Sequence, residues 1–303
     1  MEKKWWHKTV GYQIYPKSFQ DTNGDGIGDL KGVIRHLDKI EKLGANVIWL
    51  CPVFASPMVD NGYDISDYMD IDPSFGTMED MKELIAEAKK RGIRILMDLV
   101  VNHSSDRHAW FQAALKDPFG KYGKYYVFRE GKDGKEPNNW RSIFGGSAWE
   151  KVPGYDNLYY LHIFTKEQPD LNWENPELRE EIYEMILKWM DLGLGGFRLD
   201  AISHLKKNYQ YTNLPPDEYN MAFEYFNNVD GLADILCEMK ERTFAPTDAL
   251  TIGEYDHMGP EDVEDVIGEN GSFSSVFDFC HTLDNVRNPK WGNTVAPISI
   301  SYC

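Results

Sequence analysis

Hydrophobic and polar positions alternate along the first 101 residues in a way that predicts three short strands separated by two amphipathic helices. The strands are expected at Gly11–Tyr15, Val47–Val53 and Arg94–Val101, where apolar residues run almost without interruption. The helices are expected at Asp29–Leu43 and Met78–Arg91, and a glycine directly follows each of them. Short apolar strands that alternate with amphipathic helices are typical of an α/β fold with a parallel sheet.

This alternation stops after His103 and resumes near Trp173. The stretch between them is rich in aromatic residues, glycine and proline, and it holds short alternating pieces such as Leu158–Phe164 but no strand–helix unit. A structureless loop of that length is uncommon unless it is functional. We therefore expect either a long functional loop or a small inserted domain, placed at residues 104–172.

Beyond the insertion the alternation predicts three further strands. A helix is expected at Pro176–Leu192, with Asn175 as its N-cap and a proline at its first position. The remaining expected elements are the strands Gly196–Asp200, Leu250–Glu254 and Ser274–Phe279 and a helix at Asp217–Arg242. One barrel with parts at residues 1–103 and 173–303, in which six strands stand where a (β/α)8 barrel needs eight, would fit this pattern, and so would two smaller domains.

Two of the predicted strands end at a carboxylate. The segment Gly-Gly-Phe-Arg-Leu-Asp ends at Asp200, with Arg198 two residues earlier, and Thr-Ile-Gly-Glu ends at Glu254. The carboxyl ends of parallel barrel strands carry the chemistry, so both side chains should face one pocket. Either residue alone could be an ordinary polar strand cap. Together they are the minimum needed to cleave an acetal such as a glycosidic bond.

The third strand and its end supply further polar side chains. Asp98 is expected to be buried and to need a partner, and Arg198 on the neighbouring strand can provide it. The charge of Arg198 would also favour the ionised form of Asp200. His103, just past the strand end, could donate to a ligand hydroxyl, or it could be an ordinary core histidine.

Two more segments are expected at the same rim. Asp60 could accept hydrogen bonds from sugar hydroxyls, and Tyr63 could stack on a sugar ring. Gln168, in a Gln-Pro-Asp-Leu-Asn segment at the end of the insertion, could reach over the pocket. Each segment also fits a simple turn or loop.

An oxygen-rich loop between the first strand and the first helix resembles a calcium site. It offers the side chains of Asp21, Asn23, Asp25 and Asp29 and the carbonyl of Ile27. Calcium takes six to eight such oxygens. The loop is not an EF-hand, because Gly32 stands at the twelfth position and a strand precedes it. A metal-free turn held by Asn and Asp side chains is the alternative.

The composition of the chain limits the kinds of molecule that it can bind. The chain has 32 basic and 49 acidic residues, a net charge of −17, and no long basic run, which argues against nucleic acid or an anionic membrane. A neutral small oligosaccharide remains compatible. The four scattered cysteines match no metal or redox spacing, and neither a signal peptide nor a membrane span is evident, so a reducing, cytoplasmic location is expected.

The ordered set of motifs resembles the α-amylase family, glycoside hydrolase family 13. It runs from Tyr-Gln-Ile-Tyr-Pro at 12–16 through Asp98–His103 and Gly196–Asp200 to Gly253-Glu254. The segment at 168–172 and the Asp21–Asp29 loop are similar to those of the oligo-1,6-glucosidase and α-glucosidase branch, where the loop binds calcium. The resemblance implies a (β/α)8 barrel with a small domain inserted after the third strand, and no organic cofactor.

The resemblance also implies residue roles. Asp200 would be the nucleophile of a retaining, exo-acting α-glucosidase, and Glu254 the general acid/base, which we expect to be the less solvated of the two. The pocket for the terminal glucose would be lined by Asp60, Tyr63, His103 and Gln168, with Arg198 beside the nucleophile and Phe144 and Phe164 as aromatic walls.

The resemblance does not fix which glycosidic linkage would be cleaved. In this branch, enzymes that cleave α-1,6 bonds often have valine directly after the nucleophile, and enzymes that cleave α-1,4 bonds often have a smaller residue. Ala201 at this position therefore favours maltose-like substrates. Isomaltose-type substrates, sucrose isomerisation, trehalose-phosphate hydrolysis and glucosyl transfer remain open. A catalytically silent amylase-like module is a further alternative, although such modules usually lose the carboxylates that this chain keeps.

The sequence departs from the family in its last part. An Asn-His-Asp segment with the family's third carboxylate is absent from these 303 residues, as are strands seven and eight and the usual C-terminal β-domain. We expect an N-terminal portion of a glucosidase that is inactive by itself, with open sheet edges. The oligomeric state is not predicted.

Overall fold

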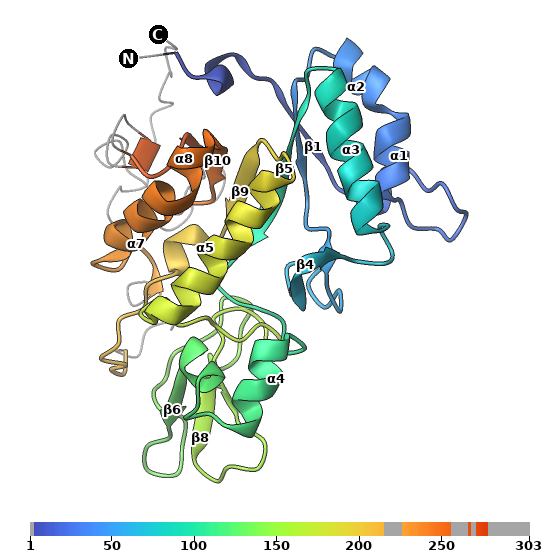
Figure 1. The fold of residues 1–303 in the computed structure, drawn as a ribbon. Coiled ribbons are helices and arrows are strands. Elements are labelled where there is room, and N and C mark those ends of the chain that lie inside the picture. Colours follow the sequence, from blue (N-terminus) through green and yellow to red (C-terminus); the bar gives the residue numbers. More distant parts are fainter. Residues whose placement is uncertain (1–2, 215–225, 256–265, 268–270, 278–303) are drawn as a thin grey trace, which may run out of the picture.

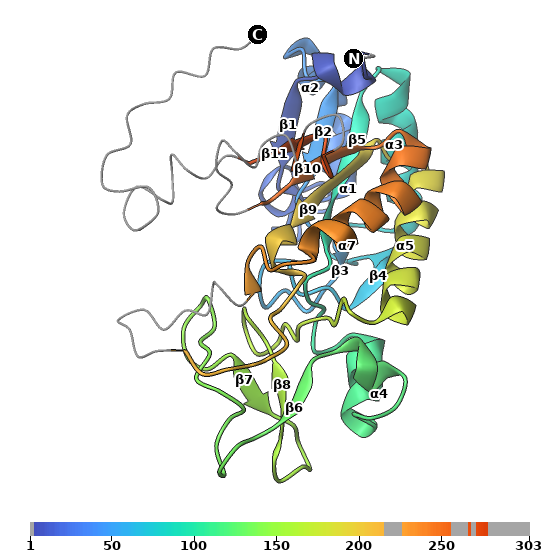
Figure 2. The ribbon, with the colours of Figure 1, turned by 90° about the vertical axis from the view of Figure 1, so that its left-hand side faces the viewer.

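The computed structural model describes residues 3–214, 226–255, 266–267 and 271–277. Its main feature is a six-stranded sheet in which every neighbouring pair is parallel. The strands, in the order of the sheet, are β1 (Gly11–Ile14), β2 (Val47–Leu50), β5 (Arg94–Val100), β9 (Gly196–Asp200), β10 (Leu250–Gly253) and β11 (Ser275–Val276). The six predicted strands are confirmed. Figure 1 shows the whole chain, and Figure 2 labels each strand of this sheet. The last is shorter than expected in its described part, since residues 278 and 279 lie outside the described residues.

Helices cover one face of this sheet, as Figure 2 shows for α1, α3, α5 and α7. They are amphipathic: α5, for example, buries Leu178, Ile182, Ile186 and Trp189, which are three to four residues apart. The predicted N-cap is found, because the Asn175 side chain accepts a hydrogen bond from the N–H of Glu177. The helices are α1 (Leu30–Arg35), α2 (Leu37–Lys42), α3 (Met78–Lys90), α5 (Pro176–Asp191), α7 (Leu232–Met239) and α8 (Ala245–Thr247), with short 3-10 or π turns at Trp5–Lys8, Pro16–Ser18, Ile202–His204 and Lys240–Phe244.

Two predicted helices differ from the structure. The helix expected at residues 29–43 is broken at His36, whose φ of −109° and ψ of 7° leave the helical region. The helix expected at residues 217–242 is confirmed only from Leu232 onward, and its described part before Leu232 is wrong. Asn228 and Gly231 have φ values of 49° and 88°, which an α-helix does not tolerate, so α7 begins only at Leu232. Residues 215–225 lie outside the described residues.

The residues between β5 and α5 form a separate small unit at one end of the sheet (Figure 1). It holds α4 (Ala109–Lys116), the 3-10 turn Tyr122–Tyr125 and an antiparallel sheet of β6 (Phe128–Glu130), β8 (Leu158–Leu161) and β7 (Trp149–Lys151), with β8 in the centre. An insertion after the third barrel strand is confirmed. The boundaries at 103/104 and 172/173 stay a prediction. A two-stranded sheet of β3 (Phe54–Ala55) and β4 (Asp67–Ile71) was not predicted.

A glycine fixes how closely β9 and β10 approach each other. Gly196, at the start of β9, has a φ of 144°, and a Cβ there would lie 1.9 Å from the carbonyl oxygen of Leu250. Any other residue would push the two strands apart or change the backbone. Because these strands end near Asp200 and Glu254, this glycine helps to bring the two carboxylates together.

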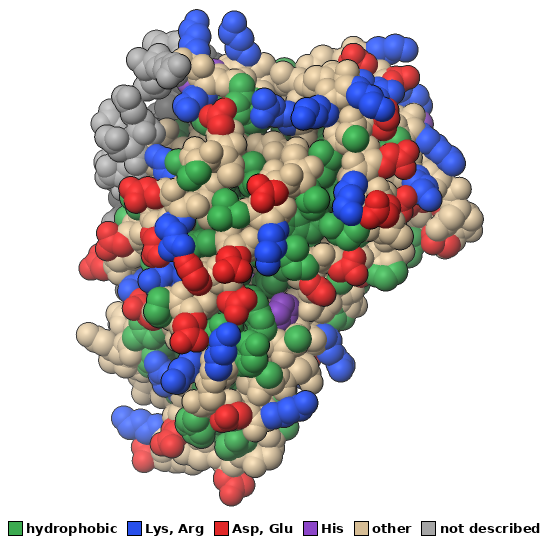
Figure 3. Space-filling model, viewed as in Figure 1, with side chains coloured by type: hydrophobic (Ala, Val, Ile, Leu, Met, Phe, Trp, Pro, Cys, Tyr) green, Lys and Arg blue, Asp and Glu red, His purple; other side chains and the backbone are tan. Residues whose placement is uncertain are grey.

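The surface mixes both signs of charge. On the face drawn in Figure 3, acidic and basic side chains lie interspersed, with apolar side chains between them. None of the helices within the described segments has both the length and the apolar character needed to cross a bilayer.

Candidate active site

The pairing of the strands places the predicted acidic residues at one rim. Asp98 and Arg198 are register partners of β5 and β9, and Val100 pairs with Asp200. Since side chains alternate between the two faces of a strand, Asp98, Arg198 and Asp200 share a face. Glu254 follows β10 directly and its N–H donates to the carbonyl of Leu199, which brings it beside the end of β9.

Arg198 joins three carboxylates at this rim. Its Nη1 lies 2.7 Å from Asp98 Oδ1 and 2.5 Å from Asp200 Oδ1, and its Nη2 lies 2.9 Å from Glu254 Oε2. The expected pairing of Asp98 with Arg198 is therefore found. Because Nη1 and Nη2 belong to one planar guanidinium, Asp200 and Glu254 lie near each other, each in contact with a nitrogen of the same group.

Two aromatic side chains contact the cluster of Arg198 and the three carboxylates. Trp49 Nε1 donates to Asp98 Oδ2 over 3.1 Å, and the Tyr63 hydroxyl donates to the same oxygen over 3.2 Å. The Arg198 guanidinium lies 5.3 Å from the Trp49 ring centre and 5.7 Å from that of Tyr63, in cation–π range. Sequence reasoning missed Trp49. Its place in the second predicted strand could have indicated it, since every second residue of a barrel strand points into the barrel.

The three carboxylates compete for one guanidinium. Burial raises the pKa of Asp98 to about 6, an effect that Arg198 opposes. Burial also raises the pKa of Asp200 well above its usual range; Arg198 again opposes the shift, and the nearby charge of Glu254 adds to it. From the sequence, Arg198 was expected to favour the ionised form of Asp200. Arg198 does have this effect on the pKa, but the effect of burial is larger. The cluster retains a proton at a higher pH than isolated carboxyl groups do.

The expected difference in solvation is reversed. The Asp200 side chain is 11% exposed and that of Glu254 is 27% exposed, so Asp200 is the less solvated of the two. The two residues differ in their place along the strands: Asp200 is the last residue of β9, whereas Glu254 stands one residue beyond β10. The N–H of Ala201 donates to Glu254 Oε2 over 2.8 Å and fixes that carboxylate in place.

Four predicted pocket residues lie together next to this cluster. Gln168 Nε2 donates to Asp60 Oδ2 over 3.0 Å and to the Tyr63 carbonyl over 3.2 Å. His103 Nε2 lies 3.0 Å from the same carbonyl. Burial lowers the pKa of His103 to about 3, so the ring is neutral at physiological pH. The Tyr63 hydroxyl already donates to Asp98, and His103 is only 1% exposed. Both residues therefore support the pocket in this structure.

The two predicted aromatic walls come from the insertion. Phe164 packs with its ring centre 5.0 Å from that of His103 and 5.6 Å from that of Phe144. Phe144 is 60% exposed, so its ring is free to meet a ligand. The pair also borders an open groove of about 530 Å³ on the inserted unit.

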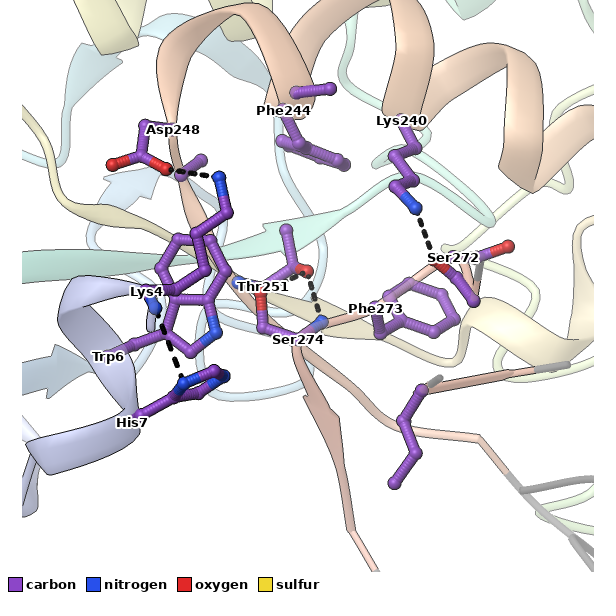
Figure 4. A pocket seen from close by; sticks show the side chains of 14 residues that line it. Lys4, Trp6, His7, Lys240, Phe244, Asp248, Thr251, Ser272, Phe273 and Ser274 are labelled. Atoms are coloured by element: carbon purple, nitrogen blue, oxygen red, sulfur yellow. Dashed lines mark hydrogen bonds and ion pairs between the residues drawn. The ribbon is translucent and has the colours of Figure 1, made fainter. Parts of the chain in front are cut away.

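A second cavity lies away from these residues. Its volume is about 360 Å³. Figure 4 shows Trp6, Phe244 and Thr251 in its lining, where Lys4 also pairs with Asp248. Thr251 is at the amino-terminal half of β10, whereas the acidic cluster follows the carboxyl ends of the strands. None of the predicted catalytic or pocket residues lines this cavity.

The oxygen-rich loop is closed by its own hydrogen bonds. Asp21 accepts N–H groups from Asn23, Gly24 and Gly26, and those of the two glycines lower the pKa of its carboxyl group. The Asp29 carboxylate accepts hydrogen bonds from the Thr22 hydroxyl and, as the N-cap of α1, from the N–H of Gly32. Within the described part of the chain, no three His, Cys, Asp or Glu side chains are grouped as metal ligands. The carbonyl of Ile27 and the Asn23 and Asp25 side chains would have to complete a calcium site, which stays a prediction.

A curved parallel sheet with an acidic cluster at the carboxyl ends of its strands and a small unit inserted after its third strand defines a part of a (β/α)8-barrel protein. The chain belongs to the α-amylase family: residues 13–299 match the family described as alpha amylase, catalytic domain.

Relatives and solved structures agree with this assignment. The chain is 48% identical to the probable oligo-1,6-glucosidase 3 of Bacillus subtilis over 93% of its own length and 51% of the relative's. It is 47% identical to the oligo-1,6-glucosidase of Parageobacillus thermoglucosidasius, over 96% and 52% of the two chains. The structure of Bacillus licheniformis trehalose-6-phosphate hydrolase matches with a TM-score of 0.88 and 42% identity, over 92% of this chain and 50% of that one. The chain therefore spans about half the length of the curated relatives it matches.

Proposed function

We propose that this chain carries the catalytic carboxylates of a retaining, exo-acting α-glucosidase that removes terminal α-linked glucose from short oligosaccharides. The observation that supports this most strongly is the single guanidinium of Arg198 bound to both Asp200 and Glu254. In retaining glycosidases the two carboxyl groups stand about 5–5.5 Å apart, one to attack and one to protonate. Two carboxylates held by one guanidinium are close enough for such a pair.

In the proposed reaction, Asp200 attacks the anomeric carbon while Glu254 gives its proton to the glycosidic oxygen, whose bond to that carbon breaks. Glu254 then takes a proton from water, and the water oxygen displaces Asp200 and releases glucose with its anomeric configuration retained. The cluster suits this sequence, since both carboxyl groups contact one guanidinium and therefore lie near the same point of a bound sugar. Arg198 stabilises the negative charge on Asp200 before attack and after its release.

Both relatives are named oligo-1,6-glucosidases, and we propose isomaltose-type oligosaccharides with α-1,6 bonds as the first candidate substrate. Maltose-type substrates are the second, because of Ala201. The structure adds a physical reason for a small residue there. Ala201 has a φ of 47°, and a β-branched residue in this left-handed region is strained. Ala201 therefore fits its backbone whichever bond is cleaved.

A chimera tests this function. Residues 1–277 are followed by the matching second half of the Parageobacillus relative, and kcat/KM is measured for isomaltose and maltose. We expect hydrolysis of both, with isomaltose preferred. A preference for maltose would support the second candidate. No hydrolysis of either sugar by a folded chimera, while the parent relative remains active, would overturn the proposal.

We also propose that the Asp21–Asp29 loop binds a structural calcium ion. The bound ion would stabilise the folded state through linkage, by about 2.7 kcal/mol at a free concentration 100 times Kd. We expect calcium to raise the melting temperature of the purified chain and a chelator to lower it. Asp25→Asn should remove the difference, whereas Asp117→Asn, outside the loop, should keep it. Equal melting temperatures with calcium and with chelator would refute the site.

A reducing, cytoplasmic location is proposed on one further observation. The two described cysteines, Cys51 and Cys237, are both free thiols. Proteins of oxidising compartments more often pair their cysteines. The proposed partner is a small, neutral oligosaccharide.

A further inference from the structure

A buried lysine connects three segments behind the candidate site. Lys207 is fully buried, and its Nζ lies 3.0 Å from Asp170 Oδ2 and 2.8 Å from Asn102 Oδ1. Asp170 ends the insertion, Asn102 follows β5, and Lys207 follows β9. Because it has no exposed surface, Lys207 does not reach a ligand, and its effect on the site must pass through its neighbours.

The chemistry of these groups fixes the orientation of Asn102. An ammonium group only donates hydrogen bonds, so Asn102 must turn its amide oxygen to Lys207. The amide nitrogen then faces the other way, where it lies 3.2 Å from His103 Nδ1. An amide nitrogen only donates, so His103 Nδ1 must offer a lone pair and carry no proton.

The other side of the imidazole ring agrees with this arrangement. His103 Nε2 lies 3.0 Å from the Tyr63 carbonyl, which only accepts, so the single proton belongs on Nε2. Gln168 Nε2 is also 3.0 Å from His103 Nε2, and its two hydrogens are accepted by Asp60 and the Tyr63 carbonyl. Without Lys207, Asn102 could turn over and accept a proton from Nδ1, while Nε2 accepted from Gln168.

We propose that Lys207 is a positioning residue that acts through Asn102 to keep His103 Nδ1 free of a proton. His103 is thereby held as a neutral ring with its one N–H on Nε2, toward the corner formed by Asp60, Tyr63 and Gln168. The charge of Lys207 adds to this effect, since it opposes a second proton on the ring. Resting on the proposed function, the N–H on Nε2 then holds the Tyr63 carbonyl in place, so that Asp60 and Gln168 beside it keep their positions in the sugar pocket.

The protonation of His103 Nδ1 can be read directly from imidazole ¹⁵N chemical shifts of the 303-residue chain at neutral pH, with signals assigned through a His103→Gln variant. The wild type should show an unprotonated Nδ1 and a protonated Nε2. Asn102→Asp keeps the shape of the side chain and gives Lys207 a second carboxylate, but it presents only acceptors. We expect Nδ1 to become protonated. An unprotonated Nδ1 in Asn102→Asp, or a protonated one in the wild type, would overturn the proposal.

The chain offers a matched pair of lysine variants. Lys207→Met is made together with Asp170→Asn, so that no uncompensated charge stays buried. Lys206→Met removes the adjacent lysine, which pairs with Glu174 at the surface. We expect protonation of His103 Nδ1 to appear in the first variant and to be absent from the second. A wild-type pattern in both would exclude Lys207 as the cause.

The functional consequence needs the active chimera. There, the Lys207→Met and Asp170→Asn pair should raise KM for isomaltose about 3- to 10-fold, the usual worth of one hydrogen bond, with little change in kcat. An altered Nδ1 signal with unchanged KM would refute the role in sugar binding and leave the effect on the ring intact. An inactive parent chimera would count against the proposed function instead.

Discussion

Replacement of Asp200 by asparagine or of Glu254 by glutamine in the chimera should lower kcat for isomaltose by at least about 100-fold, the low end of a general acid/base contribution. Asparagine cannot form the covalent bond to the sugar, and glutamine cannot supply the proton. Initial rates of glucose release measure both effects. Asp248→Asn is the control, because Asp248 pairs with Lys4 at the surface and should leave the rate unchanged.

The leaving group separates the two roles. A p-nitrophenolate needs little help from an acid, so Glu254→Gln should lose less activity in bond cleavage on p-nitrophenyl α-glucoside than on isomaltose. Asp200→Asn should lose as much on both substrates, because each must be attacked. Near-normal hydrolysis by either variant would contradict its assigned role, and an equal loss of Glu254→Gln on both substrates would contradict the role of Glu254 as the acid.

Replacement of Arg198 by methionine should be the most destabilising single change at the site. It leaves Asp98, Asp200 and Glu254 without the cation that all three contact. Removal of one partner of a buried ion pair costs about 3–5 kcal/mol. Urea unfolding of the 303-residue chain at pH 8 measures the loss. Arg242→Met is the matched control, because Arg242 pairs with Glu180 at the surface and should leave the unfolding midpoint almost unchanged.

The pH dependence of this loss has a definite sign. Asp98 has a folded-state pKa raised to about 6, above the usual value for aspartate, so its protonated form favours the folded state. That contribution is fully present below the unfolded pKa and is lost as the pH rises through 6. Without Arg198 the carboxylates are harder still to ionise. The deficit of Arg198→Met should therefore be larger at pH 8 than at pH 5. An equal deficit at both pH values, or none, would contradict the account.

Much of the barrel and its rim could be predicted because the signals are local. Short apolar runs predicted the six strands. The two carboxylates were expected to share a rim because each follows directly on such a run, at the strand ends that carry the chemistry of a barrel. The Asp98–Arg198 pair followed from the expectation that adjacent strands place buried opposite charges together. The ordered motifs added the roles proposed for Asp200 and Glu254, which the geometry accommodates.

The rest depends on contacts between distant segments. The burial of Asp200 relative to Glu254 was predicted in the wrong order, because it depends on where each strand ends: Asp200 is the last residue of β9, whereas Glu254 lies one residue beyond β10. The link from Lys207 to Asp170 and Asn102 joins segments up to 105 residues apart and has no local pattern. The late start of α7 follows from left-handed backbone at Asn228, which its residue type permits but does not require.

The central claim is that Asp200 forms a covalent bond to glucose while Glu254 serves as the acid and base. Mass spectrometry of the Glu254→Gln chimera after reaction with α-glucosyl fluoride tests it most directly. Fluoride departs without an acid, and the missing base slows the second step, so a glucosyl ester should accumulate. The account predicts a hexose on the peptide that contains Asp200. A hexose on another residue, or consumption of the fluoride with no adduct, would contradict it.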